Sequence, residues 1–253
     1  MQNPSTGSTH AIIVLRRSDA TQRGDAGRAQ HPEVTARSGP VAEPRQEMAE
    51  SRYSDSPIVP SLAVMAMNLV HRWCCSSEMW ARKTESQLLP WALQGVELGE
   101  DALEIGPGYG ANLRVLTRRT PRLTAVEIDE TMASRLQRLY GDQATVIQGD
   151  GTKLGFDNDR FSSVVCFTML HHVPTPDLQD ELFAQAHRVL APGGVFAGSD
   201  GVHSTFFRLL HIGDTYNPVP TASLQDRLRA VGFTDIEHHL DGGNQRWRAV
   251  KAA

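Results

Sequence analysis

The sequence lacks the marks of a secreted, disulfide-bonded or membrane-spanning protein. Of its 253 residues three are cysteines, and two of these, Cys74 and Cys75, are neighbours in the chain. No CxxC or Cys/His ligand spacing is present, so a disulfide framework is excluded. The longest apolar run, LAVMAMNLV at 62–70, is too short to span a bilayer, and AIIVL at 11–15 lacks the length and cleavage site of a secretory signal. We therefore expect a reducing, cytoplasmic location.

The sequence also lacks a large excess of acidic or of basic residues. The formal net charge is −4 at pH 7, and the sequence contains no basic patch. No Asn/Asp-Pro-Pro-Tyr type motif follows VVCF at 164–167. Because nucleic-acid binding needs a basic footprint, we expect no nucleic-acid partner. No membrane span is expected, and the oligomeric state is left open.

Residues 1–60 are poor in the residue types that build cores. They contain no Phe, Trp or Lys, and the first lysine of the chain is Lys83. Apart from AIIVL they show no helical or strand period, so they cannot bury enough apolar surface to offset the entropy of ordering. We expect a disordered N-terminal extension over 1–60, with a regulatory tail as the alternative, and one domain over 61–253. Periodic sequence begins near Met65 and Met67, so a translation start at one of these two residues is a further alternative.

The rest of the chain alternates between short apolar runs and amphipathic stretches. Strands are predicted at 101–106, 123–129, 144–150, 161–170 and 195–200, with APGG as a turn before the last. Helices are predicted at 62–75, 83–95 (kinked or split by Pro90), 109–119, 130–140 and 177–190. Such alternation is typical of an α/β fold with a parallel sheet and helices on both faces. Segments 232–240 and 244–250, joined by DGG, predict an antiparallel hairpin that completes a seven-stranded, Rossmann-like sheet.

The segment ALEIGPGYGANL at 102–113 is the most informative motif. Its glycines stand at three alternate positions, Gly106, Gly108 and Gly110, directly after an apolar strand. A glycine loop between a strand and a helix presents free backbone N–H groups to a ligand, and the loose pattern G-x-G-x-x-G/A is met. Glu127 lies about 20 residues further on, where an acid that binds a ribose belongs. The glycines alone leave the ligand open.

Glu104, two residues before the first glycine, favours a cationic ligand. We expect its carboxylate to point toward the ligand of the loop. Beside a pyrophosphate this would cost roughly 4 kcal/mol per charge pair at about 4 Å and an effective dielectric of about 20. Beside a cation the sign reverses. S-adenosylmethionine carries an ammonium and a sulfonium and no phosphate, so the acid favours S-adenosylmethionine over NAD.

From about residue 67 to 253 the chain resembles the class I S-adenosylmethionine-dependent methyltransferases of the type-11 family. The resemblance rests on five segments that occur in order: EIGPGYG, AVEID, QGDGTKLGF, FSSVVCFTMLHHV and RVLAPGGVF. It implies a methyltransferase (EC 2.1.1.-) with S-adenosyl-L-methionine as cofactor and a small-molecule methyl acceptor as partner. It also implies that the N-terminal helices fold over the cofactor as a lid.

The resemblance assigns cofactor contacts to nine residues. They are Glu104, Gly106, Gly108, Gly110, Glu127, Ile128, Asp150, Gly151 and Phe167. The first acid and the three glycines hold the methionine end, Glu127 binds the ribose hydroxyls, and Ile128 packs on the adenine. Asp150 receives the adenine amino group, and Phe167 lies near the methionine chain. Gly151 stands where the family more often has alanine, which makes the neighbouring backbone contact looser.

The acceptor side is expected in the loops after the fourth and fifth strands, at the carboxyl edge of the sheet. The catalytic candidates there are His171, His172 and Asp200, with His203 close by, because a histidine can remove a proton near neutral pH. There are two alternatives to catalysis. One of the adjacent histidines packs in the interior, and Asp200 caps the next helix. No HxxxH or HExxH spacing occurs, so no metal site is predicted. Further candidates on the next helix and loop are His211, Asp214 and Tyr216.

Two other functions are compatible with the glycine loop. One is an NAD(P)-binding Rossmann oxidoreductase, although no Tyr-x-x-x-Lys or similar hydride-transfer constellation is present. The other is a non-catalytic module that retains the cofactor loop. Neither the acceptor nor the methylated atom, O, N or C, follows from the sequence.

Overall fold

The structure, a computed structural model, describes residues 68–253, apart from the side chain of Val70. The predicted extension over 1–60, the start of the domain at 61 and the first part of the helix expected at 62–75 lie outside the described residues. Within the described range no helix is long and apolar enough to cross a membrane.

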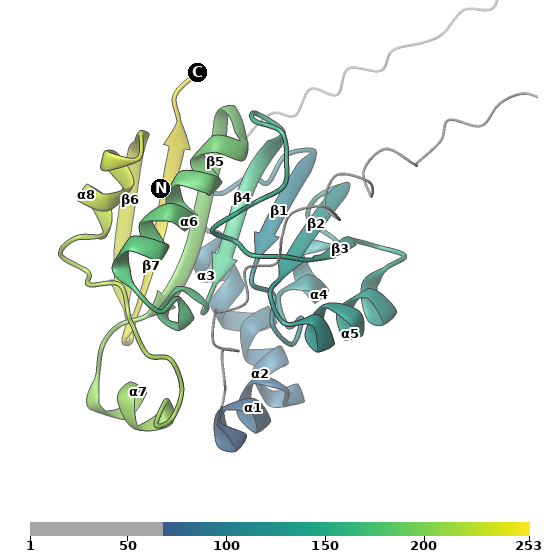
Figure 1. Cartoon of the computed structure of the whole chain (residues 1–253), viewed down its shortest axis with the longest axis vertical. Coiled ribbons are helices and arrows are strands. Elements are labelled where there is room, and N and C mark those ends of the chain that lie inside the picture. Colours follow the sequence, from purple (N-terminus) through teal and green to yellow (C-terminus); the bar gives the residue numbers. More distant parts are fainter. Residues whose placement is uncertain (1–67) are drawn as a thin grey trace, which may run out of the picture. The chain divides into compact units, whose positions relative to one another are not determined.

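The centre of the fold is a seven-stranded sheet with the order β3-β2-β1-β4-β5-β7-β6 (Figure 1). The strands are β1 (Asp101–Ile105), β2 (Arg122–Glu127), β3 (Thr145–Gln148), β4 (Phe161–Phe167), β5 (Leu190–Gly201), β6 (Phe233–Asp241) and β7 (Asn244–Lys251). The first five pair in parallel, and β7 is antiparallel to both β5 and β6. The predicted α/β sheet with an antiparallel C-terminal hairpin is confirmed.

Helices cover both faces of this sheet. They are α1 (Leu69–Cys75), α2 (Glu78–Lys83), α3 (Leu89–Ala92), α4 (Leu113–Leu116), α5 (Glu130–Tyr140), α6 (Pro176–Val189), α7 (Thr205–Leu210) and α8 (Leu224–Ala230). One buried cluster joins the strands to α6 and α8, with Phe183 and Leu228 among its members. The other joins them to α3, α4 and α5, with Leu89, Leu116 and Leu136 among its members.

Side chains of the central strands alternate between these two clusters. In β4, Val164 and Cys166 belong to the cluster of α6 and α8, whereas Val165 and Phe167 belong to the cluster of α3, α4 and α5. Successive side chains of a strand point to opposite faces, and a strand covered on both faces needs apolar residues at nearly every position. The run FSSVVCF therefore forms a strand in the middle of the sheet.

Two local predictions were wrong where the chain departs from simple periodicity. The helix expected at 109–119 is reduced to α4, because the glycine loop continues to Asn112. The interruption expected near Pro90 is present: a π-helical segment at Thr84–Leu88 separates α2 from α3, and Pro90 is the second residue of α3. APGG is not a turn but part of β5, where the pairing with β4 shifts register between Phe161 and Ser163.

The C-terminal hairpin forms as predicted. Its two loop residues, Gly242 and Gly243, have φ angles of +53° and +84°. A two-residue hairpin turn of type I′ needs positive φ at both positions, which glycine adopts without strain.

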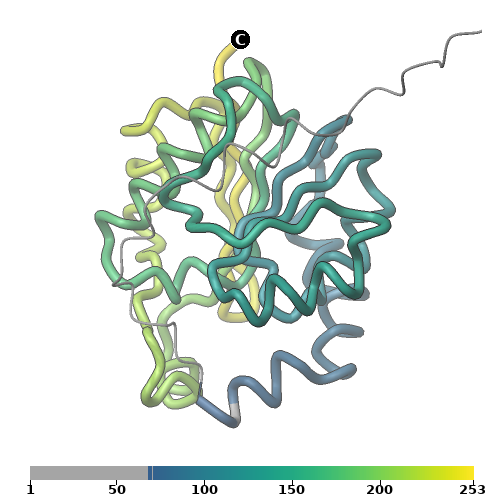
Figure 2. Tube along the Cα trace, turned by 45° about the vertical axis from the view of Figure 1, so that its right-hand side comes forward, coloured from purple at the N-terminus to yellow at the C-terminus, as the bar shows by residue number. Residues whose placement is uncertain are grey.

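The parallel strands bring their carboxyl ends to one edge of the sheet. Figure 1 shows α1 and α7 beyond this edge, at the bottom of the view. In the turned view of Figure 2 the start of α1 lies beside the α7 segment. These elements, together with the loops that follow β1, β2, β3, β4 and β5, define the region where a ligand of such a sheet is bound.

Candidate functional site

The glycine loop leaves the carboxyl end of β1 and leads into α4. Gly106, Gly108 and Gly110 have φ angles of +71°, +54° and +82°, in the left-handed region that favours glycine. A Cβ on Gly110 would lie 2.5 Å from Cδ2 of Leu136 in α5, so the loop also packs tightly against that helix. No atom lies within 4 Å of the position that a Cβ would take on Gly108. The loop therefore packs against α5 at Gly110 and has free space beside it at Gly108.

Glu104 lies in β1 directly below this loop and is fully buried. Its Oε1 accepts a hydrogen bond of 2.7 Å from Nδ2 of Asn112, at the far end of the loop. Its Oε2 is buried and has no hydrogen-bond partner among residues 68–253. Burial raises the pKa of the Glu104 carboxyl to about 8, and the nearby charge of Glu127 acts in the same direction. The end of β1 thus holds a carboxyl oxygen without a partner among the described residues, which becomes a free acceptor when the group is ionised.

Glu127 ends β2, the strand next to β1, and reaches the same loop. Its Oε2 accepts from the Gly108 N–H at 2.8 Å, and its Oε1 accepts from the Asp129 N–H at 3.0 Å. Burial raises the pKa of this carboxyl, while the backbone donors oppose the rise. Two buried carboxylates on adjacent strands therefore flank one glycine loop.

The loop after β3 carries Asp150 and Gly151, and it is joined to the end of β2 by a 2.9 Å hydrogen bond from the Gly149 N–H to the Glu127 carbonyl. Oδ1 of Asp150 accepts from both the N–H and the Oγ1–H of Thr152, at 2.8 Å each. A Cβ on Gly151 would lie 2.5 Å from Cγ2 of Ile105 in β1. The end of β1 therefore approaches Gly151 so closely that alanine would not fit without a shift.

Not all of the predicted cofactor residues share this arrangement. Glu104, Glu127 and the glycines are joined by hydrogen bonds and backbone contacts, and Ile128 is half-buried at the end of β2. Phe167 is 1% exposed, and its side chain packs in the cluster of α3, α4 and α5. Asn112, which fixes Glu104, was missed, because nothing in its spacing distinguishes it from a helix-start residue.

The predicted acceptor-side residues His171 and Asp200 form a buried pair. The backbone N–H of His171 donates to Oδ2 of Asp200 at 2.8 Å, and Nδ1 of its ring lies 2.5 Å from Oδ1. The side chains are 3% and 0% exposed. Asp200 therefore does not cap the following helix; the side chain of Ser204 does so for α7.

Three more histidines surround this pair. The ring of His172 lies 4.2 Å from that of His171, and the ring of His211 lies 4.8 Å from it, measured between centroids. His71, in α1, lies 4.3 Å from His211. Burial lowers the pKa of His172 to about 2 and that of His211 to about 4. His203 lies outside the buried group, where Nδ1 contacts the hydroxyl of Tyr216 at 3.2 Å.

Asp214 connects the N-terminal helix to the loop after α7. It accepts from the backbone N–H of Asn68, and its Oδ2 lies 2.8 Å from Nδ1 of His71. Nδ2 of Asn68 also donates to the carbonyl of Leu210 at 2.8 Å. His71 was missed in the sequence, because its partner lies 143 residues away and no local spacing signals the contact.

Comparison with known proteins assigns the central part of the chain to a family. Residues 103–198 match the family model described as a methyltransferase domain. Over 81 residues the chain is 35% identical to the ribosomal RNA small subunit methyltransferase A of Thiobacillus denitrificans, covering 32% of this chain and 32% of that protein. Over 108 residues it is 27% identical to the sterol 24-C-methyltransferase of Yarrowia lipolytica, covering 40% and 28%. The chain thus spans less than a third of the length of either relative.

Solved structures show the same architecture. The N-methyltransferase NodS from Bradyrhizobium japonicum, in complex with S-adenosyl-L-homocysteine, superposes with a TM-score of 0.57 and 17% identity over 72% of this chain and 92% of that chain. At this identity the similarity shows the fold alone. Together with the observed strand order, these matches mean that residues 103–198 are a methyltransferase domain of the type-11 family, built on the class I S-adenosylmethionine-dependent methyltransferase fold.

Proposed function

We propose that this chain is an S-adenosylmethionine-dependent methyltransferase that acts on a small-molecule acceptor. The observation that carries the proposal is Oε2 of Glu104, a buried carboxylate oxygen without a partner in the described range, at the base of the glycine loop. A buried acceptor without a donor costs free energy, and a ligand ammonium group that donated to it would remove that cost. The family assignment of residues 103–198 supports the same cofactor.

The charges around the loop fit S-adenosylmethionine better than a dinucleotide. Glu104 and Glu127 put two carboxylates beside the loop, and a pyrophosphate would be repelled by each of them when ionised. The strand order argues in the same direction. Dinucleotide domains have the order 3-2-1-4-5-6, whereas here β7 lies between β5 and β6. An NAD(P)-dependent oxidoreductase is therefore the weaker interpretation.

The acceptor atoms that remain on the acids suit the rest of the cofactor. Each oxygen of Glu127 accepts one backbone N–H, so a lone pair on each remains for a ribose hydroxyl. Oδ1 of Asp150 accepts two bonds from Thr152, which leaves Oδ2 for the adenine amino group. Ile128 would pack on the adenine, and Gly151 lets the loop after β3 approach closely. Phe167 would support the methionine side from within the core.

The chain's part in the reaction would be to orient the acceptor and to move its proton. S-adenosylmethionine supplies a methyl group on a positively charged sulfur. Holding the acceptor in line with that methyl group can provide an effective molarity of roughly 10⁵ M or more. His171 is the candidate base, because Asp200 accepts from its Nδ1 and leaves Nε2 with the lone pair. His172 is a poorer base, because burial lowers its pKa to about 2.

A small, partly apolar acceptor agrees best with the surface around the histidines. Exposed apolar side chains gather on α1, on α7 and directly after α7: Leu69, Trp73, Phe206, Leu209 and Ile212. The net charge of −4 gives no electrostatic support for RNA binding. The match to a ribosomal RNA methyltransferase makes RNA the rival acceptor, although that match covers 81 residues.

A methyl-transfer assay separates these acceptors. The full chain is incubated with radiolabelled S-adenosylmethionine and either a panel of small phenols, amines and carbon acids or unmodified ribosomal RNA. We expect label in a small molecule and none in RNA; label in RNA alone would overturn the proposed acceptor class. With the accepted substrate, His171→Ala should lower the single-turnover rate by roughly 10²–10⁴-fold, and His239→Ala, on the edge strand β6, serves as the control. Equal rates for the two variants would refute the role of His171 as a general base.

A further inference from the structure

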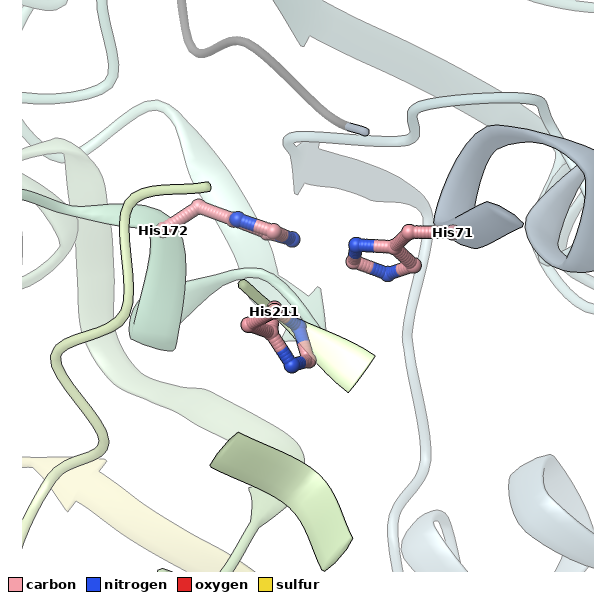
Figure 3. A group of neighbouring side chains, drawn as sticks. All are labelled: His71, His172 and His211. Carbon is pink, nitrogen blue, oxygen red and sulfur yellow. The ribbon is translucent and has the colours of Figure 1, made fainter. Parts of the chain in front are cut away.

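Three of the buried histidines converge from segments that are far apart in the sequence. His71 comes from α1, His172 from the single 3-10 turn Leu170–His172 after β4, and His211 directly follows α7. Each offers a ring nitrogen, and these three nitrogens all lie within 4.8 Å of one another. Figure 3 shows the three rings facing one another across a common centre. Rules based on local spacing, which predict no metal site here, do not detect such a group.

Two of the three rings, those of His71 and His211, are held by a hydrogen bond from Nδ1. Nδ1 of His71 donates to Oδ2 of Asp214 at 2.8 Å, and Nδ1 of His211 donates to the carbonyl of Phe207 at 2.7 Å. A carboxylate or carbonyl that accepts from one ring nitrogen fixes the tautomer and directs the lone pair of the other nitrogen, as it does in metal-binding histidines.

Nε2 of His211 provides an independent sign that a ligand is missing. This nitrogen is buried and has no hydrogen-bond partner within residues 68–253. Because Nδ1 of the same ring carries the proton that goes to Phe207, Nε2 has a lone pair that no donor of the described chain satisfies. Packing of neutral imidazoles alone would leave this cost uncompensated.

We propose that His71, His172 and His211 form a three-histidine site for a divalent transition-metal ion, with Zn²⁺ as the first candidate. Neutral imidazole is the form of histidine that binds a metal ion. Imidazole nitrogens suit zinc, copper, iron and nickel, whereas magnesium and calcium need oxygen ligands. Tetrahedral Zn–N bonds of about 2.0–2.1 Å place ligand nitrogens about 3.3 Å apart, so small ring rotations close the site.

Three protein ligands leave a fourth position for water or an incoming donor atom, the arrangement found in catalytic zinc sites. The site would also join α1, the loop after β4 and the segment after α7 into one unit. Metal binding requires no methyl donor, so this inference stands or falls independently of the proposed function. His171 and Asp200 lie beside the site, since the rings of His171 and His172 are 4.2 Å apart.

Metal titration of the full chain, purified without a histidine tag and stripped with a chelator, tests the proposal. We expect the wild type to bind one Zn²⁺ or Co²⁺ per chain, to gain thermal stability on binding, and to show the visible absorption bands of Co²⁺ bound by nitrogen ligands. His211→Ala should lose saturable binding. His239→Ala, whose side chain is 51% exposed on β6, is the matched control and should bind as the wild type does.

Two results would overturn the proposal. One is a wild-type chain that takes up no Zn²⁺ and no Co²⁺ in stoichiometric amount. The other is a folded His211→Ala variant that binds as tightly as the wild type. If His211→Ala does not fold, Asp214→Ala decides instead: it retains all three ligands and should bind metal roughly 10–100-fold more weakly, and unchanged affinity would contradict the site.

Discussion

Replacing Glu104 by glutamine should stabilise the protein while weakening its cofactor binding. Burial raises the pKa of the Glu104 carboxyl from 4.5 to about 8. The folded chain therefore holds this proton more tightly than the unfolded chain does. Between these two values the folded state binds more protons, so the free energy of unfolding falls as the pH rises.

The size of the effect follows from the two pKa values. Each pH unit between them changes the free energy of unfolding by about 1.36 kcal/mol, which sums to about 5 kcal/mol by pH 8. In Glu104→Gln the amide oxygen can still accept from Nδ2 of Asn112, and no proton is exchanged. The variant should match the wild type near pH 4.5 and exceed its stability progressively up to pH 8.

The opposite outcome is expected for the ligand. S-adenosylhomocysteine carries an ammonium group that favours the ionised carboxylate, so its binding to the wild type should release a proton and tighten as the pH rises toward 8. The Glu104→Gln variant loses one charge-assisted hydrogen bond, worth roughly 1.5–3 kcal/mol. It should therefore bind S-adenosylhomocysteine about 10- to 100-fold more weakly than the wild type does. Its affinity should also lose the pH dependence.

Urea unfolding followed by circular dichroism at several pH values, with calorimetry of S-adenosylhomocysteine at the same values, measures both effects. Carboxyls other than Glu127, whose charge interacts with Glu104, titrate equally in the two proteins, so the difference between their curves reports on Glu104 and its coupling to Glu127. Parallel stability curves for wild type and variant would refute the argument from burial. Equal affinities would refute the assignment of Glu104 to the cofactor.

Three further changes test other parts of the site. Glu127→Ala should weaken S-adenosylhomocysteine binding at least tenfold in calorimetry, because two charge-assisted hydrogen bonds are lost; unchanged affinity in a variant with the wild-type circular dichroism spectrum would refute the ribose contact. Gly151→Ala would place a Cβ 2.5 Å from Cγ2 of Ile105 and should cost about 1–3 kcal/mol in urea unfolding; wild-type stability would mean that the strand end yields easily. Asp214→Ala removes the acceptor for Asn68 and His71, and amide exchange over Leu69–Cys75 should quicken while that of the central strands does not; unchanged exchange would show that α1 is held by other contacts.

Much of the fold could be predicted because strand periodicity is a local signal. Val164, Val165 and Cys166 follow one another without a polar break, as a strand covered on both faces requires. Gly242 and Gly243 suit a type I′ turn whatever surrounds them. The same approach failed for the glycine loop. A helix was expected over 109–119, but the loop continues to Asn112 and α4 begins at Leu113.

Only the cofactor side of the candidate site could be predicted from the sequence. The carboxylates of Glu104 and Glu127 stand at fixed places relative to strand ends, so their proximity follows from a parallel sheet. The histidine group depends on contacts between segments more than 100 residues apart, such as His71 with Asp214, which are 143 residues apart. No spacing rule reaches across such a distance. Asp200 was recognised as a candidate, but its bond to His171 depends on how the loop after β4 turns back over β5.

The measurement that bears most directly on the central claim is a calorimetric titration of the full chain with S-adenosylhomocysteine and, separately, with NAD. Buried carboxylates at the ends of β1 and β2, one with an oxygen that lacks a donor in the described chain, predict that S-adenosylhomocysteine binds one molecule per chain and that NAD produces no heat of binding. Micromolar binding of NAD with no binding of S-adenosylhomocysteine would contradict the proposal that this chain is an S-adenosylmethionine-dependent methyltransferase.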